Sequence, residues 1–141
     1  MSDYDALIRF RKWELDGLRR ELSELEAGCQ EVTDAIREQD EFVESERSAQ
    51  TDVMVGMSYG AFAQAALDRR EQYLVILKER EAEAEEKREV VREAFQEMKK
   101  IEVARDRALV EINKQESRRE QGELDENALQ KHTRILSEAD I

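Results

Sequence analysis

Apolar residues recur every seven positions along the first third of the chain. One row starts at Ile8, and a second row starts four residues earlier, at Tyr4. The first row is Ile8, Leu15, Leu22, Cys29, Ile36 and Val43, and the second is Tyr4, Arg11, Leu18, Leu25, Val32 and Gln39. The first row is apolar throughout and the second is mostly apolar. Two such rows form the stripe of a coiled coil, so the pattern predicts one helix over about 3–47.

The heptad period stops in the segment that follows. Residues 48–59 contain Ser, Thr, Asp and Gly56, and Ser58 is placed to cap a following helix. We therefore expect a turn over about 48–59. Met54 and Met57 are expected either to pack locally or to offer adaptable contacts to a partner.

The helical period then resumes and predicts a second helix over about 60–137. Its expected inner face is Phe62, Ala66, Tyr73, Leu77, Ala84, Val91, Phe95, Met98, Ile101, Ala108 and Ile112. Residues 78–89 are almost wholly charged, and we interpret them as a solvated stretch with charge pairs along the helix that offers only alanine to the seam. Folding back at the turn sets Ile8 near Ile101, which leaves about 30 residues of the second helix without a partner helix.

These elements predict an all-α fold, a long antiparallel two-helix coiled-coil hairpin with the second helix longer than the first. We expect residues 1–141 to form a single coiled-coil unit that is monomeric on its own. Composition agrees, because 41% of the residues are charged and proline is absent, which suits a narrow seam better than a thick core. The alternative is a structural coiled-coil dimer, in which residues 48–59 are only a skip in one parallel rod.

Charge and residue usage exclude several function classes. The net charge of −12 disfavours nucleic acid, whose phosphates select a basic surface. No apolar run is long enough to span a bilayer and no signal-peptide core follows Met1, so we expect a cytoplasmic chain without membrane insertion. His132 has no second metal ligand at helical spacing, and Cys29 belongs to the seam. We expect no catalytic, cofactor or metal site, and no enzyme.

Three regions outside or at the edge of the seam could bind a protein. The first is an aromatic patch framed by basic residues: Arg9, Phe10, Lys12, Trp13, Gly17 and Arg20. Such a cluster is typical of an interface hot spot, although Trp13 could instead pack on the second helix. The second is the start of the second helix around Tyr59, where core packing is the alternative. The third is the thin apolar stripe after Val103, which could equally be a solvated, fraying end.

Three short passages stand out along the chain. They are the opening stretch LIRFRKWELDGLRRELSELE (Leu7–Glu26), the motif Tyr59-x-x-Phe62 at the start of the second helix, and the acidic element Glu123–Glu126 (ELDE) near the end. All three resemble the family of the flagellar export protein FliJ, whose members have a similar opening stretch, a Tyr-x-x-Phe motif at the start of their second helix and an acidic element near their end. The resemblance spans the whole two-helix plan.

The resemblance implies a stalk in the flagellar type III export apparatus, similar to the central stalk of rotary ATPases. It implies that the chain binds the hexameric flagellar export ATPase, promotes ring assembly, and contacts the membrane export gate protein FlhA. Escort of export chaperones, and a place at the cytoplasmic face of the inner membrane at the flagellar base, are implied as well. A virulence-type secretion stalk is the alternative within this class.

Two sets of site residues follow. By resemblance, the gate-contact face comprises Phe62, Ala66, Arg69 and Tyr73. Ala66 stands where the family usually has a leucine. As a hypothesis from the residues themselves, the ATPase-ring end is assigned to Arg9, Phe10, Lys12, Trp13 and Arg20.

Overall fold

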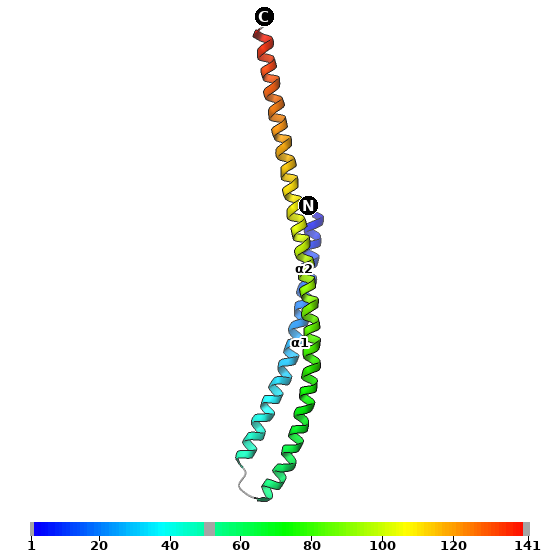
Figure 1. The fold of residues 1–141 in the computed structure, drawn as a ribbon, viewed down its shortest axis with the longest axis vertical. Coiled ribbons are helices and arrows are strands. Elements are labelled where there is room, and N and C mark those ends of the chain that lie inside the picture. The colour runs from blue at the N-terminus through cyan, green and yellow to red at the C-terminus, as the bar shows by residue number, and fades with distance from the viewer. Residues whose placement is uncertain (1, 50–52, 140–141) are drawn as a thin grey trace. The chain divides into compact units, whose positions relative to one another are not determined.

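The computed structural model contains two helices, α1 and α2 (Figure 1). It describes residues 2–49 and 53–139, with side chains over 3–49 and 58–139. Helix α1 spans Ser2–Ser48 and helix α2 spans Val53–Ala139, and no strand occurs in the described ranges. The helices contain 47 and 87 residues. The all-α hairpin with a longer second helix is therefore confirmed, and a single parallel rod is not what forms.

The connection between the helices is shorter than the turn expected over 48–59. Helix α1 ends with the Ala49 N–H donating to the Ser45 carbonyl at 3.2 Å, and α2 has already begun at Val53. Nothing in residues 53–59 stops a helix, because proline is absent and the single Gly56 costs only about 1 kcal/mol. The expected contacts of Met54 and Met57 fall on side chains outside the described residues.

The contacts divide the chain into two units, which we describe separately. The hairpin unit is Lys12–Gln96. The terminal unit combines Met1–Arg11 with Glu97–Ile141, of which residues 2–11 and 97–139 are described. The expectation of a single unit over 1–141 remains a prediction.

In the hairpin unit, α1 and α2 run antiparallel, as the cyan and green parts of Figure 1 show. The two helices pack along one apolar seam. Leu15, Val32 and Ile36 of α1 are buried, as are Ala66 and Ala84 of α2, and Ala84 is 0% exposed. The other heptad positions of α1 in this unit are half-buried: Leu18, Leu22, Leu25, Cys29, Gln39 and Val43. The predicted stripe is therefore the seam that holds the hairpin together.

The charged middle of α2 takes part in this seam, contrary to the expectation for residues 78–89. Arg80 and Lys87 lie in the same seven-residue row of α2 as the buried Ala66, and Arg70 lies in the same row as the buried Ala84. All three basic residues are half-buried. Long basic side chains can lay their methylene groups along an apolar surface while the charged head reaches polar partners. The stretch therefore supplies the seam with arginine and lysine as well as alanine.

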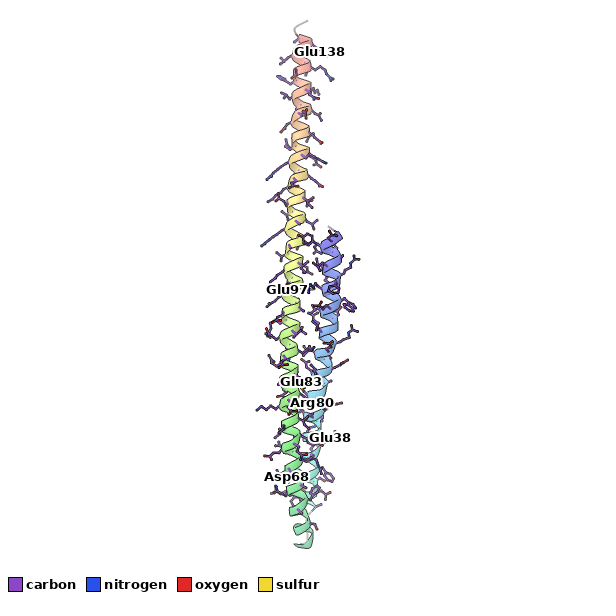
Figure 2. The ribbon with its side chains drawn as sticks, turned by 90° about the vertical axis from the view of Figure 1, so that its right-hand side faces the viewer. Glu38, Asp68, Arg80, Glu83, Glu97 and Glu138 are labelled. Carbon is purple, nitrogen blue, oxygen red and sulfur yellow. The ribbon has the colours of Figure 1, made fainter. Side chains whose placement is uncertain are left out.

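In the terminal unit, the beginning of α1 packs against α2 after Glu97. Ile8 and Met98 are buried, and Arg105 Nη1 lies 3.4 Å from Asp5 Oδ1. From Leu109 to Ala139 every residue is exposed, including Glu138, which is labelled in Figure 2. The last part of α2 thus leaves its apolar side chains on the surface.

Candidate functional site

Several ion pairs across the hairpin unit join cations on α2 to carboxylates on α1. Arg70 Nε lies 3.1 Å from Asp40 Oδ1, Lys87 Nζ lies 2.8 Å from Glu21 Oε2, and Arg88 Nε lies 3.3 Å from Glu26 Oε1. These side chains are a quarter exposed or more, so each pair alone contributes little to stability. Together they favour one register of α2 along α1, because sliding would separate all of them.

Arg80, labelled in Figure 2, contacts the backbone of α1 as well as a carboxylate. Its Nη1 donates to the Gly28 carbonyl at 2.9 Å and lies 3.8 Å from Glu31 Oε2. An added Cβ on Gly28 would meet the Arg80 side chain at 3.8 Å, which is ordinary contact distance. The Arg80 side chain therefore lies against α1 at Gly28, where α1 has no side chain of its own.

The Arg88 guanidinium keeps its charge throughout the neutral pH range. The hydrogen bond that Arg88 donates to the Glu85 carboxylate, together with attraction to Glu26, raises the pKa of Arg88 above its ordinary value. Because the pKa of Arg88 is higher in the folded state than in the unfolded state, its protonation stabilises the fold at every pH below the unfolded-state pKa. This stabilisation is lost only as the pH rises through the folded-state pKa. Both values lie far above neutrality, so the Arg88 contacts persist at every physiological pH.

The four residues assigned to the gate-contact face do not share one outward surface. Ala66 is buried at 6% exposure, and its carbonyl accepts a hydrogen bond from Gln39 Nε2 at 2.7 Å. Tyr73 lies seven residues after Ala66, in the same row of the seam, and is half-buried. Phe62 is half-buried beside that row, and Arg69 is exposed. In the closed hairpin, Phe62 and Arg69 are the members that a partner can reach most easily.

An aromatic residue of α1 joins this face, and the sequence reasoning missed it. The ring of Phe42 meets the ring of Phe62 edge-on, with centroids 5.7 Å apart and planes at 75°. Tyr59 adds a third ring, 6.3 Å from that of Phe62. Phe42 is 54% exposed. The sequence could have identified Phe42, because it is a large aromatic residue that belongs to neither heptad row of α1.

The residues assigned to the ATPase-ring end are exposed, and they fall in both units. In the hairpin unit, Trp13 is 67% exposed, and Lys12 and Arg20 are also exposed. In the terminal unit, Arg9 and Phe10 are exposed. The large exposed fraction of Trp13 argues against the alternative that its ring packs beneath the second helix.

Within the described residues, no group of three His, Cys, Asp or Glu side chains could hold a metal ion. Cys29 is a half-buried free thiol in the seam, and His132 is exposed near the end of α2. Over the described ranges, neither helix has a stretch long and apolar enough to cross a membrane.

The sequence model of a family described as Flagellar FliJ protein matches residues 1–136. The chain belongs to the FliJ family. No curated protein and no solved structure matches the chain significantly. FliJ proteins are non-catalytic adaptors of flagellar type III export that interact with the export apparatus, so this chain is a stalk-type protein related to flagellar export.

Proposed function

We propose that this FliJ protein is the stalk that joins the hexameric flagellar export ATPase to the membrane export gate FlhA. In this role it promotes assembly of the ATPase ring and works at the cytoplasmic face of the inner membrane, at the flagellar base. Escort of export chaperones is part of the same proposal. The family match supports the setting, and the inequality of the two helices supports the mechanical role.

The observation that carries the proposal is the exposed end of α2 in the terminal unit. Residues 109–139 stay helical, and all of them are exposed. Leu124, Leu129 and Leu136 are each more than half exposed. A helix without a packing partner gains little stability from propensity alone. This end is therefore suited to insertion among other subunits, as a stalk inside a ring requires.

Two separate surfaces complete the proposal. Trp13 supplies a large exposed ring among basic side chains, the chemistry of an interface hot spot, and we assign it to the ATPase. The aromatic cluster of Phe42, Tyr59 and Phe62 near the turn is assigned to the gate. The seam between these surfaces is a spacer that sets the distance from one partner to the other.

Activation of the matching export ATPase tests the first assignment. The purified chain should raise the rate of ATP hydrolysis and shift the enzyme toward hexamers, measured by light scattering. Trp13→Ala should raise the chain concentration needed for half-maximal activation about tenfold. Phe42→Ala is the matched control, because Phe42 is also an exposed aromatic residue of α1 but lies in the gate cluster. Equal activation by wild type and the Trp13 variant would remove Trp13 from this role.

Binding to the soluble part of the gate protein tests the second assignment. Phe62→Ala should weaken binding about tenfold, because a buried aromatic contact is lost. Helicity should stay nearly unchanged, with only about 1 kcal/mol of stability lost as the edge-on contact with Phe42 disappears. Trp13→Ala is the reciprocal control and should bind the gate normally. A large drop in melting temperature without a binding defect would make Phe62 a core residue only.

A further inference from the structure

One polar residue lies in the apolar seam near the turn end of the hairpin unit. Gln39 is the last member of the seven-residue row of α1 that contains Leu25 and Val32, and it is half-buried. Its Nε2 donates to the Ala66 carbonyl at 2.7 Å. Its Oε1 is buried and has no hydrogen-bond partner among the described residues. An apolar side chain at this position would avoid the cost of burying an oxygen without a partner.

The contact of Gln39 with α2 depends on the small side chain of Ala66. Ala66 is 6% exposed, and its single methyl group leaves the backbone carbonyl within reach of a side chain on α1. A carbonyl in the interior of a helix accepts one hydrogen bond from the residue four positions later and keeps a second lone pair. The Gln39 amide can therefore bond to the backbone of α2 at this position without breaking the helix.

A shift of α2 by one heptad in either direction would break this contact. Tyr59 and Tyr73 lie seven residues before and after Ala66, in the same row of α2, and both are half-buried. Opposite Gln39, either ring would cover the backbone carbonyl, because the phenol hydroxyl lies at the far end of the ring, away from the helix axis. Both polar ends of the Gln39 amide would then be buried without a partner, which costs more than the observed alignment does.

We infer that Gln39 selects the alignment of the two helices in the hairpin unit. A polar residue at one core position of a coiled coil can fix the register at a cost in stability. The ion pairs across the seam favour the same alignment, but they are partly exposed and salt screens them, whereas the Gln39 bond is neutral and part-buried. The Phe42–Phe62 contact lies one turn along each helix from this bond, so the same alignment brings the two rings together. The inference does not depend on the proposed partners.

The distance between two spin labels on the full-length chain, measured by pulsed electron paramagnetic resonance, tests the inference. Glu38→Cys and Glu83→Cys carry the labels at exposed sites that Figure 2 labels, and Cys29→Ala removes the native thiol. Because the two sites are offset along the hairpin, a shift by one heptad changes their separation by most of the ~10 Å rise of seven residues. At about 1 M salt, where ion pairs are screened, the chain with Gln39 should give one distance. Gln39→Met should add a second.

Matched controls separate alignment from packing. Methionine has nearly the length and shape of glutamine but no amide, so the melting temperature of Gln39→Met should equal or exceed that of the wild type. Leu25→Met introduces the same residue type in the same row and should keep a single distance. A single, unchanged distance in Gln39→Met would overturn the inference. A second distance that vanishes when labelled chain is diluted with unlabelled chain would also overturn it, because it would lie between two molecules.

Discussion

Replacing Ala84 by glutamate should lower the free energy of unfolding by about 3 kcal/mol. Ala84 is 0% exposed, so the seam has no room for a longer side chain and no water for a carboxylate. The opposing stretch of α1 carries further carboxylates, including Glu21 and Glu26, which add repulsion. Thermal and urea unfolding followed by circular dichroism should show a clear loss of stability.

Ala82→Glu is the matched control for this substitution. Ala82 lies two residues away on the same helix but is exposed, and the intrinsic change in helix propensity is the same. We expect its stability to stay within about 0.5 kcal/mol of the wild type. Similar destabilisation by both substitutions would mean that helix propensity, and not burial at the seam, governs this part of α2.

Lys87→Glu should destabilise the hairpin by about 2 kcal/mol. The Lys87 side chain is only 27% exposed and its Nζ lies 2.8 Å from Glu21 Oε2. The substitution removes this attraction and sets two carboxylates against each other at the seam. The same unfolding measurements apply, and the loss should be smaller at high salt because exposed parts of the pair are screened.

The charge swap separates this contact from general effects of charge. Combining Lys87→Glu with Glu21→Lys restores opposite charges at the same positions, so the double variant should regain about half of the lost stability. The coupling energy from the double-mutant cycle measures the pair directly. Additive losses from the two substitutions would show that Lys87 and Glu21 do not meet in solution.

The seam residues were predictable because a heptad repeat depends on the chain alone. Ile8, Leu15, Val32 and Ile36 were read from period and polarity, and all four are buried. The start of α2 was placed too late, because Ser58 resembles a helix cap and the apolar residues before it show no period. Local cap signals compete with continuation of the helix, and without proline the longer helix forms.

The candidate site was less predictable than the seam. The motif identified Phe62, but it did not show that Ala66 and Tyr73 pack inward or that Phe42 lies against Phe62. Arg80 and Lys87 were taken for solvated charges because their residue type suggests water. Whether a long basic side chain lies on a seam depends on what the other helix offers opposite it.

By itself, the sequence determined the two helices, the face that each buries, the acidic surface and the family. Each of these depends on residue type and spacing within one segment. Only the tertiary structure decided the register of α2 along α1. That register decides which carboxylate each cation meets and which rings touch. A seven-residue repeat is satisfied equally well after a shift of seven, so contacts between distant residues have to select one alignment.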